Sequence, residues 1–199
     1  MTPNIWWCNQ GNLDTDEEEY KGLTLWDYER HNNVVCSQYD GWKGVNRYRE
    51  TVGEVKKGDI IIHYVSPAKK PIFNKLSFRA VSCAKEDGRG HGGIKLNLPG
   101  YPPLEYNWYD DNIYPKGWIF ETEYYDFTGG GLELSDHLRR QIFNLFKSEG
   151  LDNPLQSDLR VKRPGYFRPF TSRGLHLIYQ AGQNKGWPDC VTRFFKTKE

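Results

Sequence analysis

The stretch NIWWCNQGN, residues 4–12, sets two adjacent tryptophans directly before a run of amide side chains. If residues 5–8 form a strand, successive side chains point to opposite faces of a sheet. Trp6 and Trp7 therefore cannot enter the same core. The position of this strand decides the fold, and the second tryptophan needs a separate explanation.

Composition limits the class of protein. The 199 residues favour one domain with a core of ordinary size. No apolar run approaches the ~18 residues of a membrane span, and the first residues do not resemble a signal peptide. We therefore expect a cytoplasmic protein without a membrane partner. The cysteines are expected to be buried and reduced, because they form no CxxC pair: Cys8, Cys36, Cys83 and Cys190. The histidines lack metal-ligand spacing, so we expect neither a metal nor a cofactor.

Charge and aromatic content point to a binding surface. The net charge is only +1, which favours no particular partner, but residues 137–174 are rich in Lys and Arg. Such a stretch is either a solvated face or a patch for an anion such as a phosphate backbone. Aromatic residues make up 15% of the chain, more than a small core readily hides. Because Trp and Tyr need polar partners, some of them should line a surface or a cleft.

Hydrophobic periodicity predicts a sheet with few helices. Strands are expected over residues 5–8, 59–65, 78–84 and 118–127, with a last strand or a short helix over 175–179. Ser135 caps an expected helix over 136–148, and a shorter helix is expected over 46–51. Residues 86–117 are rich in Gly, Pro, Asn and Tyr and predict a long loop. Without βαβ alternation, this pattern favours an α+β fold built on a small mixed β-barrel flanked by a few helices.

Several fragments in one order resemble the EVE branch of the PUA-like superfamily, which is related to YTH domains. The similarity lies in IWWCNQGN, LTLWDY, VGEVKKGDIIIHYV, FRAVSCAKE, KGWIFETEYYDF and KRPGYFRPFT. Within that branch, the chain resembles the N-terminal reader domains of modification-dependent restriction systems, the McrB-type GTPases and the EVE–HNH nucleases. The resemblance implies a reader domain over residues 1–185. Residues 186–199 are then expected to be a C-terminal tail or the start of a linker to a further domain.

The resemblance implies a non-enzymatic reader that flips one modified base out of double-stranded DNA into an aromatic cage. Stacking and hydrogen bonds to the base edge would offset the cost of unpairing. We expect Trp6 in the barrel core and Trp7 towards the pocket. Trp26 corresponds to the tryptophan that stacks on the methylated base in YTH domains, whereas His63 faces the other way and is expected to be structural. The expected base-binding residues are Trp7, Asn9, Gln10, Asn12, Trp26, Tyr64, Tyr101, Tyr106 and Trp108.

The expected DNA-backbone contacts come from the basic stretch: Arg139, Arg140, Lys162, Arg163 and Arg168. A fused or partner nuclease or NTPase would carry any catalysis, because the sequence lacks GxSxG, P-loop and HExxH motifs. Two alternatives stay open. One is a PUA- or YTH-like domain that reads methylated RNA, and the other is a protein-interaction module. The identity of the modified base is also open among 5-methylcytosine, its hydroxymethyl form and N6-methyladenine.

Overall fold

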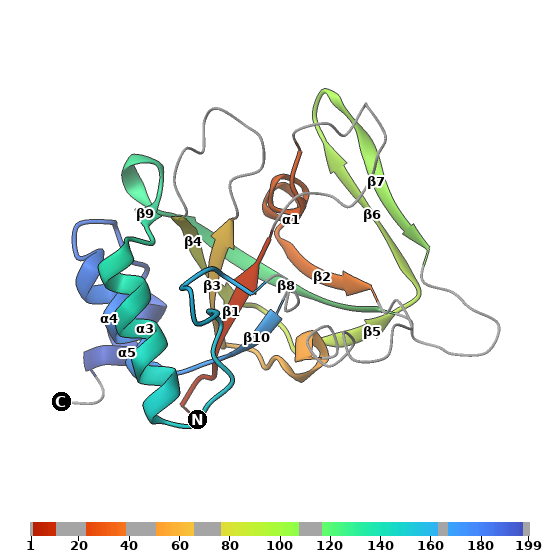
Figure 1. Cartoon of the computed structure of the whole chain (residues 1–199). Coiled ribbons are helices and arrows are strands. Elements are labelled where there is room, and N and C mark those ends of the chain that lie inside the picture. Colours follow the sequence, from red (N-terminus) through yellow and green to blue (C-terminus); the bar gives the residue numbers. More distant parts are fainter. Residues whose placement is uncertain are drawn as a thin grey trace.

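The computed structural model describes residues 2–10, 23–38, 51–65, 77–107, 117–162 and 167–196, with side chains for all of these except residues 38, 106 and 107. Its centre is a mixed sheet that curls into a half-barrel (Figure 1). Along the sheet the main strands follow the order β10 (Phe167–Phe170), β1 (Ile5–Asn9), β3 (Ile60–Val65), β4 (Ser77–Ala84), β8 (Gly117–Asp126) and β2 (Val34–Gln38).

Strands β1 and β3 are neighbours in this sheet and run parallel, with Trp7 opposite Ile62. Strand β10 pairs antiparallel with the other side of β1. All six residues of β3, IIIHYV, are buried, which is typical of a strand covered on both faces. The strands expected over 5–8, 59–65, 78–84 and 118–127 are therefore confirmed within one or two residues.

The region 86–117 was expected to be a long loop, but its described residues up to 107 contain three strands. Strand β5 (Arg89–His91) pairs with β8, and β6 (Gly93–Leu98) forms a hairpin with β7 (Tyr101–Asn107). The expectation of a loop was wrong because the hairpin buries few side chains and so lacks regular alternation; of those described, only Leu96 is fully buried. A short strand, β9 (Leu132–Glu133), pairs with the start of β4.

Three helices cover one face of the sheet (Figure 1): α3 (Asp136–Ser148), α4 (Ser172–Ala181) and α5 (Asp189–Lys196). Helix α3 has the expected bounds, and the Ser135 hydroxyl accepts from the Leu138 amide as its N-cap. Residues 175–179 lie inside α4, so the helical alternative is the right one there. Of the helix expected over 46–51, only Thr51 is described, in the 3-10 turn η2 (Thr51–Glu54). No helix in the described ranges is long and apolar enough to cross a membrane.

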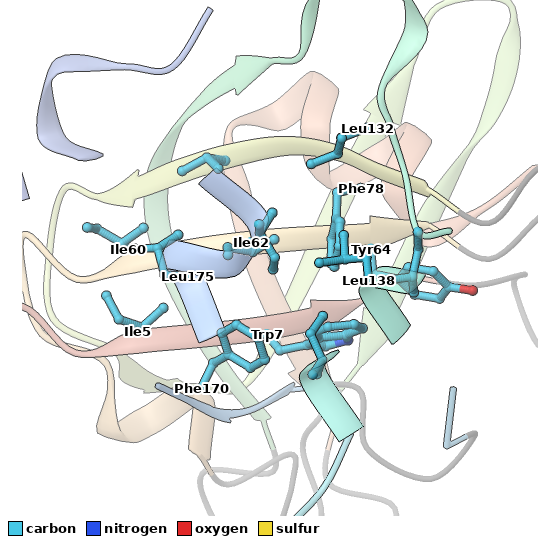
Figure 2. Packing of buried hydrophobic residues seen from close by; sticks show 14 of the residues in the cluster. Ile5, Trp7, Ile60, Ile62, Tyr64, Phe78, Leu132, Leu138, Phe170 and Leu175 are labelled. Carbon is cyan, nitrogen blue, oxygen red and sulfur yellow. The ribbon is translucent and has the colours of Figure 1, made fainter. Parts of the chain in front are cut away.

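The face under these helices is the larger apolar core, and Trp7 lies in it. Its side chain is only 1% exposed, and its ring packs against Tyr64, Phe78 and Phe170 at centroid distances of 5.6, 4.9 and 5.4 Å. Figure 2 shows these rings between the strands and the helices, together with Ile62. The prediction that Trp7 faces a pocket was therefore wrong.

The opposite face of the sheet lines the inside of the half-barrel, and Trp6 points into it. Trp6 stacks on Phe167 at 5.2 Å, and its indole Nε1 donates to Asp59 Oδ2 at 2.8 Å. Both tryptophans are buried because helices cover one face of β1 and the curled sheet encloses the other. Alternate side chains of β1 thus pack into two separate cores.

Helix α5 belongs to the same folded unit as the sheet. Its Val191 and Phe194 are buried in the core that holds Trp7, although residues 186–199 were expected to be a tail or a linker. A disulfide joins Cys190 of α5 to Cys83 of β4 across 107 residues. The expectation of four reduced cysteines is corrected for this pair, whereas Cys8 and Cys36 are buried, reduced thiols.

Trp7→Ala should lower the free energy of unfolding by about 3–5 kcal/mol, because it opens a cavity in the core under the helices. Urea denaturation monitored by circular dichroism measures the change. Tyr101→Ala is the control, since Tyr101 is 51% exposed and its loss should cost less than about 0.5 kcal/mol. Equal costs for the two variants would contradict the burial of Trp7.

Candidate functional site

Inside the half-barrel, four polar side chains form a continuous hydrogen-bonded chain that we call the polar relay. It begins at Ser82 of β4, whose Oγ lies 2.7 Å from His63 Nε2. His63 Nδ1 lies 2.7 Å from Gln10 Oε1, and Gln10 Nε2 lies 2.5 Å from Glu29 Oε2. All four residues are fully buried. The relay therefore ties β4, β3, the end of β1 and the helix α1 (Leu25–Asn32) to one another.

The acceptor at one end fixes the direction of every bond in the relay. The Glu29 carboxylate only accepts, and its Oε1 already accepts from the Cys36 amide at 2.6 Å. Gln10 must therefore donate through Nε2, which turns its Oε1 towards His63. His63 then carries its proton on Nδ1 and accepts the Ser82 hydroxyl proton on Nε2. Burial lowers the pKa of His63 to about 3, in agreement with this neutral tautomer.

Next to the relay, three rings meet and form what we call the aromatic corner: Trp26, Tyr124 and His63. The Trp26 ring meets Tyr124 at 5.4 Å and an interplanar angle of 86°, and the His63 ring lies 4.6 Å from Tyr124. The Tyr124 hydroxyl donates to the Val34 carbonyl at 2.8 Å. Burial, and next the charge of Glu29, raise the pKa of Tyr124, which therefore stays protonated. The corner is held by hydrogen bonds as well as by packing.

Helix α1 sets the position of Trp26. The Thr24 side chain caps the amide of Asp27, and the Asp27 carboxylate accepts from the Thr24 amide at 2.8 Å, which is a capping box. The helix therefore begins just before Trp26. The Thr24-x-x-Asp27 spacing is a signal for this helix that the sequence analysis missed. In β8, the side chains of Trp118, Phe120 and Tyr124 lie on the same face of the strand. This alternation likewise predicts that Tyr124 points into the half-barrel.

The Trp26 and Tyr124 rings of the corner are nearly perpendicular to each other and do not form two parallel walls. Rings at 86° cannot sandwich one flat group between them, but an aromatic ligand can stack on one ring and meet the other edge-on. Trp26 and Tyr124 are 8% and 9% exposed, whereas the side chains of the relay are fully buried, so the corner lies nearer to solvent than the relay does.

The relay itself is not an accessible catalytic site. Ser82 and His63 have the spacing of a hydroxyl and its general base, but both are 0% exposed, so a substrate cannot reach them in this structure. Gln10 uses its amide within the relay and with the Tyr124 hydroxyl. It positions the corner and does not present a free edge, contrary to its expected role in binding a base.

The structure separates the other predicted base-binding residues. Tyr64 lies beside Trp7 in the core under the helices, so its prediction as the pocket floor was wrong. Asn9 lies at the end of β1, and its Nδ2 donates to the Lys162 carbonyl at 3.5 Å. Tyr101 is exposed beside the β6–β7 turn. Three predicted positions fall outside the described residues or side chains: Asn12, Tyr106 and Trp108.

The predicted phosphate-binding cations also differ in their settings. Arg168 is only 2% exposed and donates to the Asn153 carbonyl at 3.2 Å, so it is structural and the prediction for it was wrong. Arg139 is paired with Asp136. Lys162 pairs with Asp152 at 3.1 Å, near the end of β1. Arg140 is exposed on α3, the helix-covered side of the sheet, and Arg163 lies outside the described residues.

A groove of about 910 Å³ lies elsewhere, between α3, α4 and α5, with Leu145, His176 and Phe195 in its lining. It is on the helix-covered side of the sheet and has no side chain of the relay or the corner. Volume alone therefore does not locate the site. The convergence of buried polar groups and aromatic edges favours the aromatic corner instead.

No known family model matches this chain, and no curated protein matches it in sequence. Among solved structures, it is similar to the human THYN1 protein in complex with DNA containing 5-methylcytosine, with 15% identity, a TM-score of 0.52, and coverage of 92% of this chain and 99% of that one. It is similar also to the DUF55 domain of human thymocyte nuclear protein 1, with 16% identity, a TM-score of 0.53, and coverage of 91% and 99%. These likenesses confirm the expected α+β fold, a curled mixed sheet flanked by helices.

The polar relay makes stability depend on pH through His63. The unfolded chain takes up a proton at this residue near pH 6.5, whereas the folded chain does so only near pH 3. The free energy of unfolding should therefore fall as pH drops from about 6.5 to 3, by up to about 1.4 kcal/mol per unit from this residue. Urea denaturation between these pH values measures the slope.

His63→Gln should remove this part of the slope, because glutamine does not titrate. His31→Gln is the control, since His31 is exposed on α1. If both variants keep the pH dependence of the wild type, His63 is not held neutral by the fold.

Proposed function

We propose that this chain binds double-stranded DNA and holds one modified base, flipped out of the duplex, against the aromatic corner. The observation that carries the proposal is the Trp26–Tyr124 pair, braced from behind by the fully buried relay. A base has a π face that stacks on tryptophan, and such stacking contributes ~1–3 kcal/mol. Because unpairing a base costs a few kcal/mol, a preformed surface for it is the main requirement of a reader.

The comparisons support DNA as the partner. A protein of the same fold has been solved with DNA that contains 5-methylcytosine, and the likeness covers most of both chains. 5-Methylcytosine is thus the first candidate among the three modified bases. One methyl group contributes only ~0.8 kcal/mol by burial. Strong selectivity therefore also needs a dry site, and the low exposure of Trp26 and Tyr124 favours one.

We also propose that this binding targets a nuclease or NTPase, on a fused or partner domain, as in a modification-dependent restriction system. The support is the ordered set of sequence fragments that resembles the reader domains of such systems. The inaccessible Ser82–His63 pair agrees with a chain that binds DNA without cleaving it.

A competition binding series at fixed salt tests the proposal. The probes are one duplex in four forms, unmodified or with 5-methylcytosine, 5-hydroxymethylcytosine or N6-methyladenine, and a matched single-stranded RNA. We expect one modified duplex to bind more tightly than the unmodified one. Equal affinity for all probes would refute a base reader, and tight binding to RNA alone would favour the RNA alternative.

Trp26→Ala should reduce the preference for the modified duplex by about tenfold or more, leaving weak, salt-sensitive binding, because the stacking surface is lost. Trp187→Ala is the matched control. Trp187 packs on Phe127 and Tyr179, so its loss also removes an indole but on the helix side of the sheet. It should keep the wild-type preference. If Trp26→Ala loses affinity for modified and unmodified DNA by the same factor, the proposed role of the corner is contradicted.

A further inference from the structure

Arg30 brings a positive charge to the edge of the aromatic corner. It follows Trp26 by four residues on α1, so the two side chains share one face of the helix. Its guanidinium carbon lies 5.9 Å from the centre of the Tyr124 ring. The Arg30 side chain is 39% exposed, whereas both rings are nearly buried. The cation therefore lies at the rim, on the solvent side of the corner.

Arg30 is held there by a two-pronged ion pair with Asp126, at the end of β8. Arg30 Nε donates to Oδ1 at 2.9 Å, and Nη2 donates to Oδ2 at 2.8 Å. These hydrogen bonds raise the pKa of Arg30. Because the Asp126 side chain is 52% exposed, the pair is in contact with water and contributes little to stability. Replacing the Asp126 carboxylate by another anion therefore costs little free energy.

A DNA phosphate is the anion that this position suits. The planar guanidinium fork binds a phosphate with the same two-pronged geometry as a carboxylate. A nucleotide carries its phosphate one sugar away from its base. A base stacked in the corner therefore has its own backbone close to the rim where Arg30 lies. Arg139 and Arg168 are less suited, because each is largely buried and bonded within the fold.

We propose that Arg30 binds the phosphate next to the flipped base and exchanges Asp126 for it when DNA binds. The inference rests on the proposed function, because it names a contact made by the same site. Asp126 is then a competitor that the phosphate must displace. Arg30 contributes only to the complex in which a base occupies the corner, so it strengthens selective binding more than general attraction to DNA.

Salt dependence of the dissociation constant, for the 5-methylcytosine duplex and its unmodified form, tests this exchange. Each released phosphate contact changes the slope of log affinity against log salt by about 0.9. Arg30→Gln should weaken binding of the modified duplex and reduce its slope by about that amount, with little change for the unmodified duplex. Arg30→Lys keeps the charge but not the fork, so it should keep the slope and bind less tightly than the wild type.

Asp126→Asn removes the competitor and should tighten binding of the modified duplex by up to about fivefold, since the exposed pair is worth no more than ~1 kcal/mol. This gain should vanish when Arg30→Gln is also present. The Lys95–Glu105 pair of the β6–β7 hairpin gives charge-matched controls, because it is also exposed. Lys95→Gln and Glu105→Gln should change both duplexes by the same factor.

An unchanged slope and affinity in Arg30→Gln, with wild-type selectivity intact, would overturn the role of Arg30 and leave the proposed function standing. A wild-type chain that binds both duplexes equally would refute the proposed function, and the Arg30 contact with it. Thermal unfolding of each variant verifies folding, and exposed substitutions at this pair should change stability little.

Discussion

The hydrogen bond between the Gln10 amide and the Glu29 carboxylate is the constraint on which the inside of the half-barrel depends. A fully buried carboxylate is costly unless its oxygens are satisfied, and here Gln10 and the Cys36 amide supply the donors. That requirement orients Gln10, and Gln10 in turn orients His63. The bond also joins the end of β1 to α1, the helix that carries Trp26. One polar contact thus links the centre of the sheet to the exposed edge of the corner.

The two faces of the sheet differ in what they hold: one packs an apolar core under the helices, and the other carries the aromatic corner, to which we assign recognition. On the face under α3, α4 and α5, Trp7 and Tyr64 belong to the large apolar core. On the inner face, Trp6 and Trp26 share a cluster with the aromatic part of the site. The two tryptophans of NIWWCNQGN are therefore both buried, but in different cores. Only the inner face leads to the rim, where Arg30 and Asp126 meet solvent.

Strands β1, β3, β4 and β8 and helix α3 could be predicted from the sequence because their patterns are local. Alternation in β4 and β8 and the cap at Ser135 depend on neighbours within a few residues. The roles of Trp7 and Tyr64 could not be predicted, because burial of both faces of a strand depends on helices more than 60 residues away along the chain. The relay was missed for the same reason. Its four members come from four separate parts of the chain, and no spacing in the sequence relates Ser82 to Glu29.

Two arginines show most clearly that the distribution of charge along the sequence does not locate a site. Arg168 belongs to a basic stretch and yet is buried, whereas Arg30 stands in no basic stretch and lies at the rim of the corner. Charge along the chain is therefore a poor guide to charge around a site. The fold itself was recognisable from ordered fragments, since β1, β3 and β4 carry strong local signals, and the structural likenesses confirm it.

Base flipping is the central claim, and fluorescence of 2-aminopurine measures it most directly. The probe is placed beside the 5-methylcytosine in a duplex, where its emission is quenched by stacking. If the chain extracts the modified base, emission should rise and saturate with added protein, and an unmodified duplex should give a much smaller change. Saturated binding, followed by anisotropy on the same duplex, without any rise in emission would contradict the account.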